Sequence, residues 1–126
     1  METAEFLKNR LKSGLERSVP KKILAEFEYL DDKKNQNLIH NQIAYHHAGL
    51  TMRDRQAIEN MFKEGKILWL CCTSTLAVGV NLPAHLVVVN TTKTYADGQL
   101  KEYTETEIQQ MIGRAGRPQV LVGLIF

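Results

Sequence analysis

The sequence contains few of the residues that would set it apart from an ordinary globular domain. It has two cysteines, three prolines and one tryptophan among 126 residues. The two cysteines, Cys71 and Cys72, are adjacent, and neighbouring residues of a strand point to opposite faces, so a disulfide between them would be strained. A structural disulfide is therefore not expected, and a reducing compartment, the cytosol or the nucleus, is favoured.

Long apolar runs and a strong charge imbalance are also missing. No run approaches the ~20 apolar residues that span a bilayer, and the N-terminal stretch METAEFLKNRLKSGLER lacks the apolar block of a secretion signal. We therefore expect no membrane partner. Sixteen Lys and Arg against fourteen Asp and Glu leave a net charge of +2, which neither favours nor excludes nucleic acid.

What is present is the composition of a soluble domain, with 44% hydrophobic and 24% charged residues. The length suits one domain. The polar stretch DDKKNQN is predicted to be a loop or a helix end. Helical periodicity covers 2–17, 23–30, 51–65 and 104–113, and strand-like apolar runs cover 43–45, 67–72, 86–89 and 120–126. This alternation predicts an α/β fold with a parallel sheet flanked by helices.

Local signals refine these elements. Thr51 and Thr104 are expected N-caps, with Asp54 and Glu107 three residues on as capping-box partners. The runs at 67–72 and 86–89 are continuous, which is typical of strands covered on both faces. Helical patterns precede the first strand and the last segment is apolar. We therefore expect a piece of a larger protein, with an incomplete sheet.

The segment TSTLAVGVNLPA, residues 73–84, follows an apolar strand directly. Ligands of parallel α/β sheets lie at the carboxyl ends of strands. There Thr73, Ser74 and Thr75 would present hydroxyls and backbone N–H groups to an anion, and Gly79 would let the backbone pass close to a ligand. A strand-to-helix loop with routine capping is the alternative.

The segment QMIGRAGRPQ, residues 110–119, places two arginines three residues apart. Gly113 is expected to end the preceding helix, after which Arg114 and Arg117 could grip one phosphate group from two sides. The planar fork of arginine suits that role better than lysine. A capped helix followed by solvated arginines is the alternative.

Together with YHHAGL upstream, these segments resemble the second RecA-like domain of superfamily 2 helicases of the DExH type. They are most similar to the Ski-like and Brr-like group, whose patterns are HHAGL, T-x-T-L-A-x-G-V-N-L-P-A and Q-M-x-G-R-A-G-R. The linking stretch AHLVVVNTTKTYADGQLKEYTETEIQQM resembles the meiotic crossover-promoting, Mer-type DNA helicases. The resemblance covers roughly residues 44–119.

The resemblance implies roles for individual residues. Arg114 and Arg117 match the two arginines of motif VI, which reach the γ-phosphate of ATP held by the first RecA-like domain, and Arg117 would be the arginine finger. Gln110 matches the polar residue that leads this motif, with a catalytic role. The positions expected near the nucleotide are Gly79, Asn81 and Gly113. Those expected to contact the translocating nucleic-acid strand are His47, Gly49, Arg55, Thr73, Ser74 and Thr75.

The resemblance also implies what lies elsewhere. The sequence contains neither a P-loop nor a DExH motif, so the P-loop, the Mg²⁺ site and the catalytic glutamate would belong to the first RecA-like domain. This chain alone should then not hydrolyse ATP. We expect a helical lead-in at 1–41, a motif-bearing core at 42–119 and a divergent tail at 120–126, because the family's motif IV strand is missing before Met1 and its usual sequence after motif VI is not followed.

The resulting hypothesis is part of a nuclear, ATP-dependent 3′-to-5′ DNA helicase with a role in meiotic crossover formation. Its partners would be single-stranded or duplex DNA and the first RecA-like domain of the same polypeptide. An RNA helicase of the exosome or spliceosome type is one alternative, since the motifs are shared across the group. A non-catalytic truncated module is another. A zinc site at His46, His47, Cys71 and Cys72 is disfavoured, because adjacent pairs do not have the usual ligand spacing.

Overall fold

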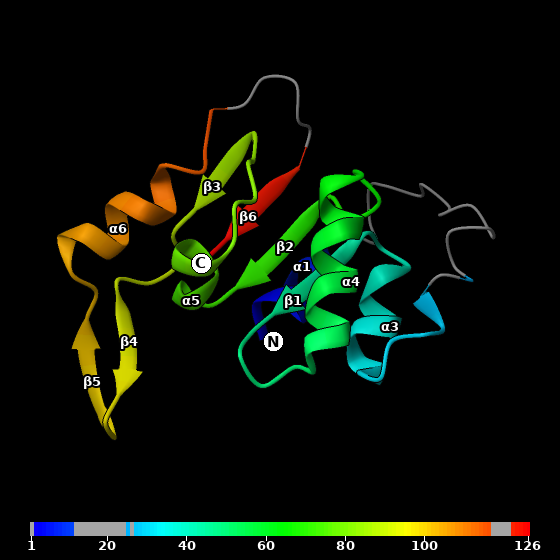
Figure 1. Cartoon of the computed structure of the whole chain (residues 1–126), viewed down its shortest axis with the longest axis horizontal. Helices are drawn as coiled ribbons and strands as arrows, with labels where there is room; N and C mark the ends of the chain where they lie inside the picture. Colours follow the sequence, from blue (N-terminus) through cyan, green and yellow to red (C-terminus); the bar gives the residue numbers. More distant parts are fainter. Residues whose placement is uncertain (1, 12–24, 26, 117–121) are drawn as a thin grey trace.

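A computed structural model describes residues 2–11, 25, 27–116 and 122–126 (Figure 1). The helices are α1 (Glu2–Leu11), α3 (Lys33–Ile39), α4 (Met52–Lys63), α5 (Ser74–Gly79) and α6 (Glu105–Ile112). The strands are β1 (Ile43–His46), β2 (Trp69–Cys72), β3 (Leu86–Val88), β4 (Lys93–Ala96), β5 (Gln99–Glu102) and β6 (Gly123–Ile125). Among the described helices, none has the length and apolar character needed to cross a bilayer.

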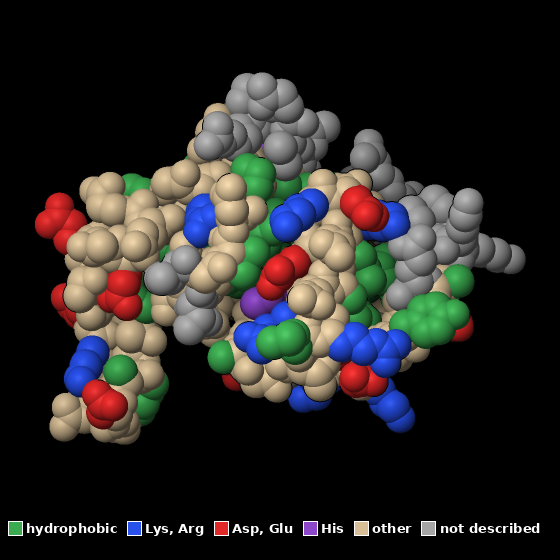
Figure 2. Space-filling model, in the orientation of Figure 1, with side chains coloured by type: hydrophobic (Ala, Val, Ile, Leu, Met, Phe, Trp, Pro, Cys, Tyr) green, Lys and Arg blue, Asp and Glu red, His purple; other side chains and the backbone are tan. Residues whose placement is uncertain are grey.

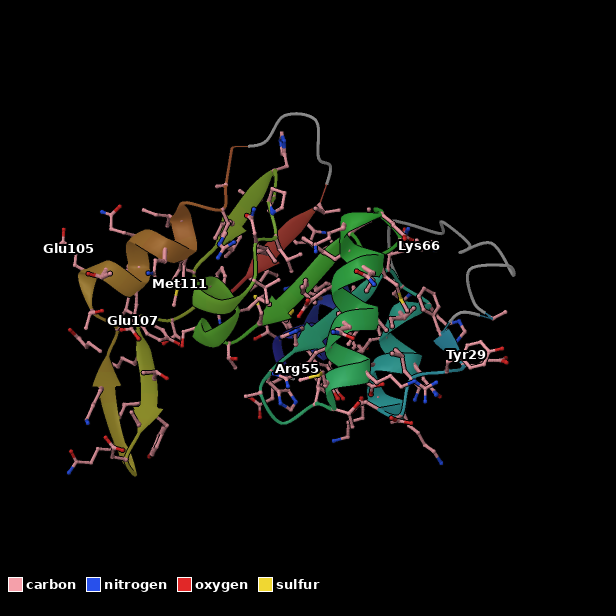
Figure 3. All side chains as sticks on the ribbon, viewed as in Figure 1. Tyr29, Arg55, Lys66, Glu105, Glu107 and Met111 are labelled. Atoms are coloured by element: carbon pink, nitrogen blue, oxygen red, sulfur yellow. The ribbon has the colours of Figure 1, made fainter. Side chains whose placement is uncertain are left out.

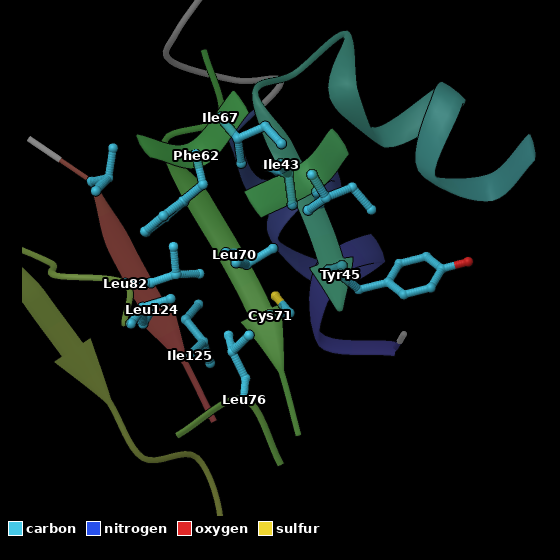
Figure 4. Packing of buried hydrophobic residues seen from close by; sticks show 14 of the residues in the cluster. Ile43, Tyr45, Phe62, Ile67, Leu70, Cys71, Leu76, Leu82, Leu124 and Ile125 are labelled. Carbon is cyan, nitrogen blue, oxygen red and sulfur yellow. The ribbon is translucent and has the colours of Figure 1, made fainter. Parts of the chain in front are cut away.

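Four strands form one parallel sheet in the order β1-β2-β6-β3, which confirms the predicted α/β class. Figure 1 shows α4 and α1 on opposite faces of β1 and β2. The core contains large side chains with almost no exposed surface, such as Ile43, Phe62, Ile67 and Leu70 (Figure 4). Helix α4 buries Ile58, Met61 and Phe62, the apolar face that the 3.6-residue pattern predicted.

The last described segment lies inside the sheet. The strand predicted within 120–126 is confirmed as β6, whose backbone pairs with β2 on one side and β3 on the other. Gly123 is opposite Trp69 in register, and a Cβ at Gly123 would collide with the Trp69 ring. A glycine is required there because the indole lies across the neighbouring strand.

The prediction for 86–89 is only half right. A strand forms at β3, but within the described residues it pairs only with β6, and its burial is low, with Leu86 48% and Val88 40% exposed. An apolar run does not distinguish a central strand from an edge strand, because the order of strands depends on the crossovers between them.

The stretch DDKKNQN was predicted to be a loop or a helix end, but most of it forms the first part of a helix, so the prediction of a loop is wrong from Lys33 onward. Helix α3 begins at Lys33, capped by Asp32, whose side chain accepts from the backbone N–H of Asn35 at 2.7 Å. The polar Asn35 is fully buried, where its amide accepts from the Tyr45 N–H at 2.9 Å and donates to the Tyr45 carbonyl at 3.0 Å. One asparagine side chain thus bonds to strand β1 as a neighbouring strand would, which hydropathy does not reveal.

Both predicted N-caps are present, with one difference. Thr104 and Glu107 form a complete capping box. The Thr51 hydroxyl accepts from the Asp54 N–H at 3.1 Å, but the buried Asp54 carboxylate accepts instead from the backbone N–H groups of Asp31 and Asp32, at 3.0 and 2.9 Å. Asp54 therefore joins the start of α4 to the segment that precedes α3.

The linking stretch forms a hairpin that was not predicted from the sequence. Strands β4 and β5 pair in antiparallel register and extend away from the parallel sheet (Figure 1). The turn residues Asp97 and Gly98 both have positive φ, of 53° and 73°, as a two-residue type I′ turn requires. The Asp-Gly pair between short polar strands was the available signal. Tyr95 is 76% exposed on this hairpin.

Candidate nucleotide and nucleic-acid interface

The predicted segments meet where the parallel strands end. The loop after β1 and the turn after β2 are joined by a hydrogen bond from the Thr73 N–H to the His46 carbonyl, at 3.3 Å. The charge of Arg114, which follows α6, acts on the thiol of Cys72, the last residue of β2. Segments far apart in the chain, 46–55, 73–81 and 110–116, therefore lie at one edge of the sheet.

The loop after β1 is shaped by His47. Its Nδ1 accepts from the Gly49 N–H at 3.0 Å, and its ring stacks on Tyr45 with centroids 5.5 Å apart and an interplanar angle of 1°. Because Nδ1 accepts this hydrogen bond, the proton of the neutral ring is on Nε2. The Nε2–H group can donate a hydrogen bond to a phosphate oxygen. A Cβ at Gly49 would lie 2.9 Å from two atoms of this ring, so the glycine permits the turn.

Beneath this loop, the buried His46 lies beside the half-buried Glu59 and Arg55. His46 Nε2 lies 2.8 Å from a Glu59 carboxylate oxygen, and the His46 Nδ1 and Arg55 Nε atoms are buried without a partner in the described part of the chain. Arg55 projects from the first turns of α4 beside the loop (Figure 3). Figure 2 shows acidic, basic and histidine side chains meeting on this face of the molecule. Burial lowers the pKa of His46 below its ordinary value, opposed by Glu59 and reinforced by the Arg55 and His47 charges.

This group of residues gives a testable pH dependence. The folded chain keeps His46 neutral where the unfolded chain would be protonated, so the unfolded state binds more protons and the free energy of unfolding falls as pH drops below about 6.5. Urea denaturation at pH 7.5, 6.5 and 5.5 should show this fall, and His46→Gln should flatten it. The exposed His85 is the control position. An unchanged slope in His46→Gln would contradict the assignment.

The turn after β2 is as the sequence predicted in outline. Thr73 is the N-cap of the short helix α5, although its side chain makes no capping bond to the helix. Ser74 begins the helix, and Thr75 has a backbone in α5 but a side chain outside the described part. A Cβ at Gly79 would meet nothing within 4 Å, so the backbone at the end of α5 borders open space. This segment has room for a ligand to approach.

The segment after α6 is attached to α5. One terminal nitrogen of Arg114 donates to the Ala77 carbonyl, and the other donates to the Asn81 side-chain oxygen at 3.4 Å. Gly113 is the C-cap of α6, where a Cβ would lie 3.0 Å from the Gln109 carbonyl. Gln110 is exposed one turn earlier. Arg117 lies outside the described residues, so its pairing with Arg114 stays a prediction.

A pocket of about 220 Å³ opens at the same edge of the sheet. Burial raises the pKa of the Cys71 thiol to about 11 and raises that of Cys72 further, which keeps both thiols protonated and unreactive at neutral pH. Within the described ranges no group of three or more His, Cys, Asp or Glu side chains could hold a metal ion. The pocket is lined by Thr3, Tyr45, His46, His47, Cys71, Cys72, Thr73, Asn90, Thr91, Tyr103, Ile125 and Phe126.

Sequence reasoning missed the residues that support this edge. The Tyr45 hydroxyl donates to an Asp32 carboxylate oxygen at 2.6 Å, and burial together with this bond raises the pKa of Tyr45. A continuous series of contacts therefore links Asp32, the N-cap of α3, through Tyr45 to the stacked ring of His47. The signal in the sequence was Asp32, a residue type that caps helices, followed three residues later by Asn35.

Comparison with known proteins agrees with this architecture. The chain belongs to the family described as the helicase conserved C-terminal domain, which matches residues 8–119. The class of protein is thus a helicase domain with a parallel α/β sheet, as the sequence motifs predicted.

Among individual relatives, the chain is similar to Mer-type DNA helicases. It is 51% identical over 100 residues to the human protein named probable ATP-dependent DNA helicase HFM1, covering 79% of this chain and 7% of that protein. It is 51% identical over 88 residues to the ATP-dependent DNA helicase MER3 of Saccharomyces cerevisiae, covering 70% of this chain and 7% of that protein. An Arabidopsis thaliana protein named DExH-box ATP-dependent RNA helicase DExH14 is 55% identical over 91 residues, covering 68% of this chain and 4% of that protein. The chain therefore spans less than a tenth of the length of these relatives.

Proposed function

We propose that this chain forms part of an ATP-dependent 3′-to-5′ DNA helicase that acts in the nucleus during meiotic crossover formation. In this role it supplies one wall of a nucleotide cleft and a surface that grips a DNA strand. The observation that carries the proposal is the meeting of three motif segments at one sheet edge, through the Thr73–His46 bond and the Arg114 contacts to Ala77 and Asn81. Similarity to the HFM1 and MER3 helicases supports DNA as the substrate.

The residues of this chain suit contact with one side of a nucleotide whose other side is held by another domain. Open space at Gly79 and the guanidinium of Arg114 nearby fit an incoming phosphate, whereas the sequence holds no P-loop to bind one alone. ATP and Mg²⁺ would be held mainly by the first RecA-like domain, and ATP hydrolysis supplies the free energy for movement. Arg114, Arg117 and Gln110 would complete the cleft on closure, with Gly79, Asn81 and Gly113 facing the nucleotide.

Strand gripping would come from the other two segments. The backbone of the 73–75 turn and the Nε2–H of His47 offer donors to phosphate oxygens, with Gly49 shaping the loop and Arg55 supplying positive charge beneath it. Contacts to phosphates ignore base sequence, which is what a translocating motor requires. The affinity for the strand should fall as the salt concentration rises, because binding depends on charge and on phosphate contacts.

The proposal is tested by strand displacement. A polypeptide that joins this chain to a P-loop domain should unwind a DNA duplex with a 3′ single-stranded overhang in the presence of ATP and Mg²⁺. A matching duplex with a 5′ overhang is the control for direction, and an RNA duplex is the control for substrate. Unwinding of RNA alone would favour the alternative that similarity to the DExH14 RNA helicase raises. No unwinding and no ATP turnover would favour a non-catalytic module.

A further inference from the structure

The guanidinium of Arg114 is held between two oxygen atoms of the α5 segment. The Ala77 carbonyl is one acceptor, and the Asn81 side-chain oxygen, 3.4 Å away, is the other. Ala77 lies inside α5 and is 3% exposed, whereas Asn81 is exposed two residues beyond the end of the helix. The arginine side chain therefore bridges the buried and the exposed parts of one segment.

The backbone of the arginine segment follows the same course. The Ala84 N–H donates to the Arg114 carbonyl at 2.9 Å, and the Gly116 N–H donates to the His85 carbonyl at 3.4 Å. Side chain and backbone together attach residues 114–116 to residues 77–85. Met111, fully buried in α6, packs in the same core as Ala77. A displacement of the α5 segment would therefore move Arg114 with it.

The chemistry of the two acceptors matters as much as their position. A backbone carbonyl and a side-chain amide are both neutral, so they orient the guanidinium without cancelling its charge. A carboxylate at position 81 would instead form an ion pair with Arg114. Its negative charge would compete with any phosphate for the guanidinium group. An asparagine there keeps Arg114 both oriented and attractive to an anion.

We propose that Asn81 is a positioning residue that holds Arg114 oriented and uncompensated in charge for a nucleotide phosphate, and links it to the strand-gripping turn after β2. This inference rests on the proposed helicase function. Because the turn at 73–79 and the bridge at 77–81 share helix α5, movement of a bound strand would be transmitted to the arginine through one short element.

Two substitutions at one position test the inference in a polypeptide that carries this chain and a P-loop domain. Asn81→Ala removes the acceptor, and the kcat of DNA-stimulated ATP hydrolysis should fall about tenfold, as expected for one lost hydrogen bond to a charged group. Asn81→Asp keeps and strengthens the contact, yet should lower kcat at least as much because it compensates the arginine charge. Asn60→Ala, an exposed asparagine on α4, is the matched control.

The outcomes separate the possibilities. Low kcat in Asn81→Asp, with a Tm no lower than that of the wild type, supports the inference, because a merely structural tether would be preserved by aspartate. Wild-type kcat in Asn81→Asp overturns it, as does a kcat in Asn81→Ala within twofold of the Asn60→Ala control. Absence of DNA-stimulated ATP hydrolysis in the wild-type polypeptide would refute the proposed function instead.

Discussion

Replacing Arg117 by alanine is expected to reduce ATP turnover by about 10³- to 10⁵-fold in a polypeptide that joins this chain to a P-loop domain. The expectation follows from the proposed role of Arg117 as the arginine finger of motif VI, which would stabilise charge on the transferring phosphoryl group. Nucleotide affinity should change little, because the P-loop domain holds most of the nucleotide. Steady-state ATPase kinetics and binding of a fluorescent nucleotide analogue measure the two effects separately.

Two further variants sharpen this test. Arg117→Lys keeps the positive charge but loses the planar fork, so its turnover should lie between those of the wild type and Arg117→Ala. Arg53→Ala is the matched control, since Arg53 is an exposed arginine on α4 whose only described ion pair is a 3.9 Å contact to Asp31. Turnover in Arg117→Ala equal to that of Arg53→Ala would remove the arginine-finger assignment.

Replacing Asp54 by alanine is expected to lower the free energy of unfolding of this chain by about 3 kcal/mol, the scale of a lost charged acceptor that leaves backbone donors unpaired. The buried carboxylate accepts from the N–H groups of Asp31 and Asp32, and no other acceptor for them is among the described contacts. Urea denaturation followed by the fluorescence of Trp69, the one tryptophan, measures the change.

The controls for this experiment use the same residue type. Asp54→Asn keeps one acceptor oxygen and should lose about half as much stability. Asp31→Ala removes an exposed carboxylate but leaves its backbone N–H in place, so its effect should stay within about 0.5 kcal/mol. A loss in Asp54→Ala no larger than that of Asp31→Ala would show that the link between α4 and the start of α3 contributes nothing.

The sequence was sufficient to propose the candidate site where short motifs are present, and the roles of its residues stay predictions. YHHAGL, TSTLAVGVNLPA and QMIGRAGR are runs of consecutive residues for which the family resemblance implies roles, so the sequence pointed to the segments 45–50, 73–84 and 110–117. The contacts between these segments were not predictable. That Arg114 reaches Ala77 and Asn81 depends on how α6 packs on α5, which no local pattern encodes.

The fold shows the same division. Capping at Thr51 and Thr104 and the periodicity of α4 and α6 arise from residues three or four apart, and these predictions are confirmed. The role of Asn35 could not be predicted, because its hydrogen-bond partner, Tyr45, lies ten residues away. The sequence also does not show whether an asparagine is buried or exposed.

By itself the sequence determined the class of fold, the positions of most helices and strands, the family and the motif segments, because each depends on neighbouring residues or on a run of matching letters. The tertiary structure alone decided the place of β6 between β2 and β3, the exposure of β3, the use of Asp54 to cap a distant segment and the bridge from Arg114 to Asn81. These features depend on which surfaces come into contact when the chain folds. A hydrogen bond or a strand pairing between distant residues cannot be recognised from either residue alone.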